Sequence, residues 1–336
     1  MENVFQLLNK EREKIMNRLC KTLSIEKPII QGPMAWISTA PLVAAVANAG
    51  GLGVLGVGFA PDEFVANQVA ETRKLTNKPF GINTVLIPEN LDRLTGLICQ
   101  IKPPVVYADT LIDVDVDLCK KYFPIWKELG CKIIVKASCI QDAINAEKGG
   151  ADVVIVKGWE GGGHTTYEAT TVLVPQAIDA LTVPVVASGG IADGRGMAAA
   201  IALGAEGIEM GTIFMACTDV MVHPNVKKAI IESKDMDTVI TGYSTGEPCR
   251  QFKNKLSEEI NRIEAENIRS VAAEKLRPVA ESSLKRAMME GDMENGAVMA
   301  GQIAAMINEE KSASDIIDTV LLGAKTRLKE IADFEL

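Results

Sequence analysis

The chain has 336 residues, of which 47% are hydrophobic and 24% charged, a composition typical of a folded globular protein rather than a disordered or fibrous one. This length exceeds one average domain but accommodates an α/β barrel of about 200 to 250 residues with a smaller attachment. Lys plus Arg total 35 against 44 for Asp plus Glu; the net charge of −9 argues against nucleic acid or an anionic membrane as a partner and favours a small molecule.

The N-terminal part of the chain predicts neither export nor a membrane helix. It lacks the basic start and apolar run of a signal peptide, and apolar residues recur among charges from Val4 to Leu19, as in a surface amphipathic helix. The most apolar stretch, residues 39–60, is interrupted by Pro41 and several glycines. The seven cysteines are scattered without a CxxC pair, so a reducing, cytoplasmic setting is expected.

From about residue 28, short β-branched runs alternate with segments long enough to be helices. Most runs are apolar on both faces, which is typical of parallel strands covered by helices. The fold class predicted is therefore α/β, a TIM (β/α)8 barrel. The eight predicted strands are Ile29–Gln31, Leu52–Leu55, Phe80–Asn83, Val105–Tyr107, Lys132–Val135, Val153–Val156, Val185–Ala187 and Gly207–Met210.

The glycines around the second strand formally match GxGxxG, the dinucleotide fingerprint, from Gly51 to Gly56. That fingerprint needs a strand before it and a helix after it, whereas here the preceding segment, Pro41 to Asn48, reads as a helix and the glycines as the strand itself. We therefore expect tight packing at this strand and not a Rossmann site.

Polar groups at the ends of the earlier strands converge on one face of the predicted barrel. Gly32, Pro33, Met34 and Ala35 follow strand one and Asn83 ends strand three. Lys136 ends strand five and would place a cation in the mouth, where it could stabilise an anionic reduced flavin. A lysine that only extends its stem along the barrel toward solvent is the alternative.

A glycine run follows the sixth strand, from Glu160 through Gly162 and Gly163 to His164. Three successive glycines are costly to order, so this backbone is expected to approach a flat ligand closely or to adopt positive φ. His164 would lie in the mouth as a proton-transfer group. The other histidine, His223, is interpreted as structural or as facing the substrate. Two histidines so far apart in the sequence do not provide the ligands of a metal site.

The loops after the seventh and eighth strands carry the strongest signal for a phosphate. Ser188, Gly189 and Gly190 follow strand seven, and Met210, Gly211 and Thr212 end strand eight. Barrel enzymes often bind phosphate at these two loops, where glycine exposes backbone N–H groups near a helix N-terminus. Two ordinary tight turns are the alternative. The helix between these strands is well specified, with Asp193 as its N-cap and Gly204 at its C-terminal end.

The pattern changes after the eighth strand, which divides the chain into three expected regions. Residues 1–217 form the barrel with its N-terminal helix. Residues 218–296 are charged and helical in pattern, without further strand–helix alternation, and predict a mainly helical cap or substrate region. Residues 297–336 return to amphipathic helix and are expected to close the outer ring of the barrel.

Six segments in this order resemble a known family: Ile30–Ala35, Ala49–Gly53, Lys78–Asn83, Glu160–His164, Ala187–Gly194 and Met210–Thr212. They are similar to the nitronate monooxygenase (2-nitropropane dioxygenase) family and its close relatives, the FMN-dependent enoyl-acyl-carrier-protein reductases. The resemblance runs from about residue 20 to the C-terminus. It implies FMN, held by its phosphate at the two glycine loops with its ring near Asn83 and Lys136, and with further contacts from the other strand-end residues and from Gln302.

The two branches of this resemblance predict different second substrates. The segment through Val298–Ala304 is similar to the enoyl reductases, but those carry a Thr-Gly-Ala-Gly-Asn-Pro turn where this chain has Tyr107–Ile112. Lys136–Ser138 resembles the lysine turn of nitronate monooxygenases instead. We therefore favour oxidation of alkyl nitronates, with His164 removing a proton from a neutral nitroalkane, over NAD(P)H-dependent reduction of an enoyl thioester.

A function from another class also accounts for part of the pattern. A flavin-free, phosphate-binding barrel isomerase or lyase would explain the two glycine loops but would leave the run Gly161–Gly163 without a purpose. The sequence leaves the assembly state open, a homodimer being one alternative.

Overall fold

The computed structural model describes residues 17–110 and 113–335, and most of the helix predicted between Val4 and Leu19 lies outside them. Eight parallel strands close into a barrel in the order β1-β2-β3-β4-β5-β6-β8-β9. The predicted barrel is thereby confirmed, and each predicted strand is present with small differences at its ends. The strands are β1 (Ile29–Gln31), β2 (Leu52–Leu55), β3 (Gly81–Val85), β4 (Val105–Asp109), β5 (Lys132–Ala137), β6 (Val153–Lys157), β8 (Val185–Ser188) and β9 (Gly207–Met210).

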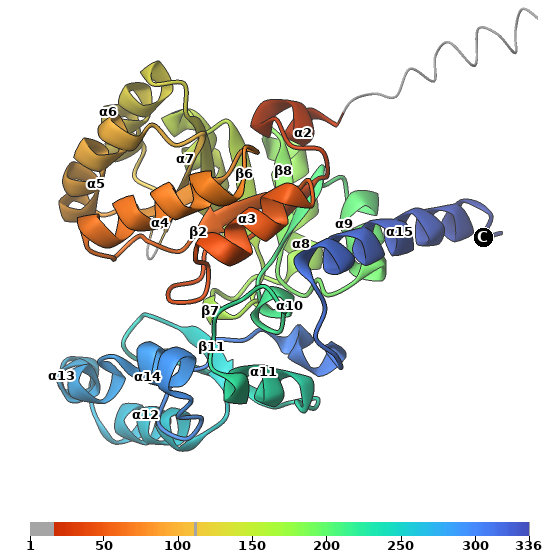
Figure 1. Cartoon of the computed structure of the whole chain (residues 1–336). Helices are drawn as coiled ribbons and strands as arrows, with labels where there is room; N and C mark the ends of the chain where they lie inside the picture. The colour runs from red at the N-terminus through yellow and green to blue at the C-terminus, as the bar shows by residue number, and fades with distance from the viewer. Residues whose placement is uncertain (1–16, 111–112, 336) are drawn as a thin grey trace, which may run out of the picture.

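Helices cover the outside of the barrel because nearly every strand residue is buried and needs an apolar layer on its outer face. The eighth outer helix is the C-terminal α15 (Ala313–Ala332), which packs against α9 and α3, as expected for a closing helix (Figure 1). Other outer helices are α3 (Ala40–Asn48), α4 (Asp62–Leu75), α5 (Pro88–Ile101), α6 (Val116–Glu128), α7 (Ile140–Gly149), α8 (Thr170–Ala180) and α9 (Gly194–Ala202).

Helix α9 begins and ends as its sequence predicts. The side chain of Asp193 accepts hydrogen bonds from the backbone N–H groups of Arg195 (2.8 Å) and Gly196 (3.3 Å). Gly204, just past the helix, has φ +102°, a conformation that residues with a side chain rarely adopt. The GxGxxG segment is also as expected, because it contains β2 itself and follows helix α3.

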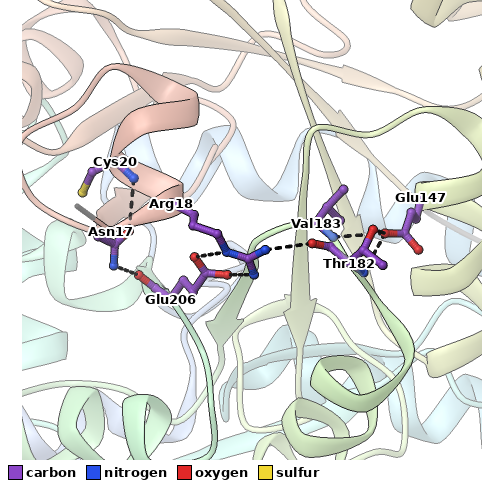
Figure 2. A network of polar contacts seen from close by, with 7 residues as sticks. All are labelled: Asn17, Arg18, Cys20, Glu147, Thr182, Val183 and Glu206. Atoms are coloured by element: carbon purple, nitrogen blue, oxygen red, sulfur yellow. Dashed lines mark hydrogen bonds and ion pairs between the residues drawn. The ribbon is translucent and has the colours of Figure 1, made fainter. Parts of the chain in front are cut away.

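A short helix, α2 (Arg18–Leu23), plugs the amino-terminal end of the barrel. Leu19 and Leu23 belong to one buried cluster with interior strand residues such as Ile30 and Val186. Figure 2 shows the polar contacts around this plug, where Arg18 donates hydrogen bonds to the Glu206 carboxylate and to the carbonyl oxygen of Thr182. This end is sealed, so any ligand must enter at the carboxyl ends of the strands.

The cap lies at that open end, away from α2 (Figure 1), and consists mainly of helices. It also contains two strands that the sequence analysis did not identify. Strands β10 (Thr238–Thr241) and β11 (Cys249–Phe252) pair as an antiparallel hairpin, and β11 also pairs with the two-residue strand β7 (Gly163–His164) after β6. The helices of the cap are α11 (Pro224–Ile231), α12 (Lys255–Glu266), α13 (Arg269–Ala280) and α14 (Ser283–Glu290). Two short helices flank the cap in the chain: α10 (Thr212–Met215) after β9 and η1 (Gln302–Met306) in the returning segment.

No helix in the part of the chain that the structure describes is both long and apolar enough to cross a membrane.

Candidate functional site

A cavity of about 310 Å³ opens at the carboxyl ends of the barrel strands and is closed on the cap side by Leu284, Met299 and Ile303. It brings together nearly all residues that the sequence predicts for the site. Those that line it are Gly32, Pro33, Met34, Ala35, Asn83, Lys136, Glu160, Gly162, Gly163, His164, Ser188, Gly189, Gly190, Met210, Gly211 and Thr212. Gln302 is the exception: its side chain is exposed and lines a second cavity, while its neighbours Gly301 and Ile303 line this one.

The two glycine loops form one wall of this cavity. Gly189 and Gly190 have φ of +94° and +71°, so both need glycine for their backbone conformation. The fold does not require glycine at Gly211: a Cβ atom there would meet only the Met34 sulfur, at 3.6 Å, and would otherwise project into the open cavity. Beside these loops, the Glu160 carboxylate accepts hydrogen bonds from the backbone N–H (3.2 Å) and the hydroxyl (2.9 Å) of Thr170.

The triple-glycine segment forms another part of the cavity wall, against the chain that returns from the cap. A Cβ atom on Gly162 would lie 2.6 Å from the carbonyl carbon of Ala300, so no side chain fits there. Gly163 has φ +75°, and a Cβ atom there would meet only the Met299 sulfur, at 3.8 Å. The expectation of positive φ in this run therefore holds at Gly163, whereas the close approach to a flat ligand stays a prediction; at Gly162 it is the protein's own backbone that approaches closely.

Two lysines lie side by side at the cavity floor. Lys136 forms a buried ion pair with Asp109; burial lowers the pKa of Lys136, but the Asp109 carboxylate outweighs this effect and raises it. Lys157 donates hydrogen bonds to the carbonyl oxygens of Gly162 (2.7 Å) and His164 (2.9 Å). Burial and the neighbouring Lys136 ammonium lower the pKa of Lys157 to about 8.

A buried carboxylate completes the floor. Glu209 accepts hydrogen bonds from the Tyr107 hydroxyl and from the Ser188 hydroxyl, both at 2.7 Å. Burial raises the pKa of Glu209, which the two hydrogen bonds and the lysines partly oppose. Gly32 makes room for this group, since a Cβ atom there would lie 2.9 Å from the Glu209 carboxyl carbon.

His164 is held by its backbone, and its ring forms no hydrogen bond with any of the residues that the structure describes. Its strand β7 pairs with β11, where it lies opposite Cys249, and Lys157 binds its carbonyl oxygen. Burial, followed by the positive charges of Lys136 and Lys157, lowers the pKa of His164 to about 4. The imidazole is therefore neutral near pH 7 and has a lone pair available for a proton.

Asn83 presents a hydrogen-bond donor to the cavity. Its Oδ1 atom accepts hydrogen bonds from the backbone N–H groups of Val57 (2.6 Å) and Gly58 (2.7 Å), which fixes the orientation of the amide. Its Nδ2 group donates no hydrogen bond to any residue that the structure describes. His223, by contrast, accepts a hydrogen bond from the backbone N–H of Asn225 at the start of α11 and does not line the cavity, which agrees with its structural interpretation.

Four polar residues of the floor were not among the predicted site residues: Tyr107, Asp109, Lys157 and Glu209. Lys157 and Asp109 are the last residues of their strands, and Glu209 is a charged residue in an otherwise apolar strand. A charged side chain in a buried parallel strand is costly unless it is paired, and that signal could have identified them.

Comparison with known proteins agrees with this architecture. The family model described as nitronate monooxygenase matches residues 16–323. A curated relative, the probable nitronate monooxygenase of Staphylococcus aureus, is 36% identical over 74% of this chain and 82% of its own length. The structure of FabK from Thermotoga maritima is similar at 38% identity and a TM-score of 0.89, covering 96% of this chain and all of that one.

A nitroalkane oxidase from Streptomyces ansochromogenes has a similar fold, with a TM-score of 0.80 at 24% identity over 94% of this chain and 99% of that one. The family model covers nearly the whole described chain, and the curated relative supports it independently. The chain belongs to the nitronate monooxygenase family of oxidoreductases.

Proposed function

We propose that this enzyme binds FMN in the cavity at the open end of the barrel and oxidises small alkyl nitronates. One observation carries the proposal: a neutral imidazole, His164, shares a buried cavity with two lysine ammonium groups, one of which has no carboxylate partner among the described residues. This combination suits a substrate that carries negative charge or acquires it when a proton is removed.

The residues of the cavity fit FMN. Gly211 leaves backbone exposed beside a space that a side chain would fill, as a phosphate requires, and Gly189 and Gly190 line the same cavity. Lys136 and the free Nδ2 donor of Asn83 suit the polar edge of the ring system. When bound, FMN supplies a two-electron acceptor for a carbanion-like substrate.

The protein's own part in the reaction is to bind an anion and to move a proton. Lys157 and Lys136 attract the negatively charged nitro group of a nitronate. For a neutral nitroalkane, a ring nitrogen of His164 would accept the proton from the carbon next to the nitro group. An anion bound beside the lysines offsets the two positive charges that lower the pKa of His164, and so strengthens this base as the substrate becomes charged.

Enoyl reduction is a second candidate, and the similarity to FabK favours it, since that structure covers 96% of this chain at 38% identity. In that case NAD(P)H would be the reductant and an enoyl thioester the substrate, with His164 as a proton donor. The low pKa of His164 weighs against this role, because an imidazole that is neutral at pH 7 holds no extra proton to donate.

Anaerobic mixing distinguishes the two candidates. The FMN-loaded protein is mixed separately with an alkyl nitronate and with NADH or NADPH, and bleaching of the flavin absorbance is followed. We expect rapid bleaching by the nitronate and slow or no bleaching by the nicotinamides. Rapid bleaching by a nicotinamide alone would establish the reductase, and a purified protein that takes up no FMN would leave the flavin-free isomerase or lyase.

A further inference from the structure

A second cavity, of about 430 Å³, lies behind the strand that carries His164. Its inner wall is formed by Trp159 and Arg250, and its rim includes the exposed residues Lys234 and Tyr243. Most of the wall comes from residues 234–240, a segment that leads into strand β10 of the cap hairpin, which the sequence did not predict.

Arg250 is the unusual group in this cavity. Its side chain is held in one orientation, because Nε donates to the carbonyl oxygen of Trp159 and Nη1 donates to the hydroxyl of Thr238, both at 3.1 Å. The guanidinium also lies against the indole ring of Trp159, 5.0 Å from its centroid. These contacts fix the plane of the group and leave its remaining N–H groups, including both on Nη2, without an acceptor among residues 17–110 and 113–335.

The charge of Arg250 is not balanced by the protein around it. Only 4% of the residue is exposed, and none of the ion pairs among the described residues includes its guanidinium. The carboxylates of Asp235 and Asp237 also line the cavity, but in the described chain neither forms an ion pair with Arg250. Buried charges in proteins are normally paired, because an unpaired one loses its hydration without compensation. The nearby Glu160 carboxylate does not fill this role, since Thr170 binds it. An anionic ligand in the cavity that Arg250 lines can supply the missing negative charge.

The remaining walls indicate the rest of the ligand. Trp159 and Tyr243 present aromatic surface, with 36% and 42% of their areas exposed, and Tyr243 is stacked on Tyr167 with ring centroids 5.7 Å apart. Exposed aromatic rings beside a planar guanidinium suit a flat ring system with an attached anion. We propose that this cavity binds a small planar-ringed carboxylate or phosphate, whose anionic group pairs with Arg250 and whose ring lies against Trp159 and Tyr243.

The site shares a partition with the catalytic cavity. In the segment after β6, Trp159 lines the second cavity, whereas Gly161 to His164 line the first. In the returning chain, Gln302 lines the second cavity and its neighbours Gly301 and Ile303 line the first. Arg250 itself is the β-sheet partner of Gly163. A ligand bound to Arg250 would therefore lie against the same backbone segment that positions His164.

Binding can be tested without measuring turnover, so the result does not depend on the proposed reaction. Calorimetric titrations use protein saturated with FMN, which occupies the first cavity. The probes are adenosine 5′-monophosphate, benzoate and adenosine: the first two carry a ring with a phosphate or a carboxylate, and the third carries a ring alone. We expect at least one of the two anions to bind at one site per chain, and adenosine to bind at least roughly 10-fold more weakly than its phosphate.

Variants locate the binding. Arg250→Met should weaken binding of the anion roughly 10- to 100-fold, as expected for a lost charge-assisted hydrogen-bonded pair. Arg262→Met is the matched control, because it removes the same charge from an exposed arginine of α12, and it should bind like the original protein. Ala305→Trp keeps Arg250 and fills the cavity, and it should abolish binding even if Arg250→Met fails to fold. Binding unchanged in Arg250→Met or in Ala305→Trp, or no binding of either anion, would overturn the proposal.

Discussion

Two ammonium groups face the same cavity floor, but only that of Lys136 has a carboxylate partner in the described chain. Lys157 uses its N–H groups to hold two backbone carbonyl oxygens, and its charge is opposed by burial and by Lys136. The pKa of Lys157, lowered to about 8, therefore makes the charge of the cavity depend on pH near the physiological range. This dependence is a direct consequence of placing two cations on neighbouring strands.

Anion binding should weaken as the pH rises through about 8, because Lys157 then loses its proton and no longer attracts the anion by its positive charge. The measurement is the inhibition constant of nitrate, an inert anion, against nitronate turnover at pH values on both sides of this point. Lys157→Gln should bind nitrate more weakly and without this inflection. An inhibition constant that does not change with pH in the original enzyme would show that Lys157 is not part of the anion site.

Replacing His164 by alanine should separate proton removal from electron transfer. We expect His164→Ala to retain FMN and to lose roughly 10²- to 10⁴-fold in kcat/KM with a neutral nitroalkane, the usual contribution of a general base. With the preformed nitronate, which needs no proton removed, the loss should be much smaller. Oxygen uptake with the two substrates measures both rates. Equal losses of kcat/KM would mean that His164 positions the substrate and does not remove its proton.

Among single residues, the cavity walls were more predictable from the sequence than the cavity floor. The glycines and His164 come shortly after barrel strands in the sequence, and residues that follow the carboxyl ends of barrel strands are readily assigned to the mouth. Lys157 and Glu209 belong to strands, and whether a strand residue points inward or outward depends on the barrel's register, which a short apolar run does not reveal.

At the scale of secondary-structure elements, the triple-glycine segment that leads into β7 tolerates substitution poorly, because its backbone packs against another part of the chain. Gly162→Ala should destabilise the fold by roughly 1 to 3 kcal/mol, because its Cβ atom would collide with the backbone at Ala300. Gly96→Ala is the control: this glycine lies inside α5 with nothing within 4 Å of its Cβ position, so alanine should stabilise by about 0.5 to 1 kcal/mol. Denaturant unfolding measures the free energy of unfolding of both variants. If Gly162→Ala leaves that free energy unchanged, the chain at Ala300 is not packed tightly against Gly162.

The barrel plug should depend on its apolar contacts more than on its ion pair. Leu19 is fully buried inside the closed end, so Leu19→Ala should cost roughly 2 to 5 kcal/mol of unfolding free energy. Arg18 pairs with Glu206 at a largely exposed position, and Arg18→Ala should cost less than about 1 kcal/mol (Figure 2). Thermal unfolding ranks the stability of the two variants. A larger loss of stability in Arg18→Ala than in Leu19→Ala would show that the plug depends mainly on its ion pair.

The barrel strands were predictable because each is a short, doubly buried run bounded by a helix-length segment. The cap hairpin was not, although Thr238–Thr241 is rich in β-branched residues, because it is short and stands among charged helical segments. Its partner β7 is only two residues long and is extended because β11 pairs with it. Such a strand depends on tertiary pairing and leaves no periodic pattern in the sequence.

The whole molecule is a barrel that is sealed at one end by α2 and covered at the other by the cap (Figure 1). We propose that its three regions, residues 1–217, 218–296 and 297–336, act together on one substrate. The first region would hold the cofactor, the second would cover the substrate, and the third would complete the barrel and the cavity wall. Met299 and Gly301 of the third region line the first cavity, so the site is complete only when the chain returns from the cap.

The proposed function requires FMN to be held at the glycine loops of this cavity. Gly211→Val tests this requirement directly, because the valine side chain would project into the cavity without a backbone clash and without strained φ at that position. Flavin fluorescence is followed while FMN is added to the flavin-free forms of both proteins, and their thermal unfolding is compared. We expect one FMN per original chain and at least roughly 100-fold weaker binding by the variant at similar stability. Equal FMN binding by Gly211→Val, or no FMN binding by the original protein, would contradict the proposed function.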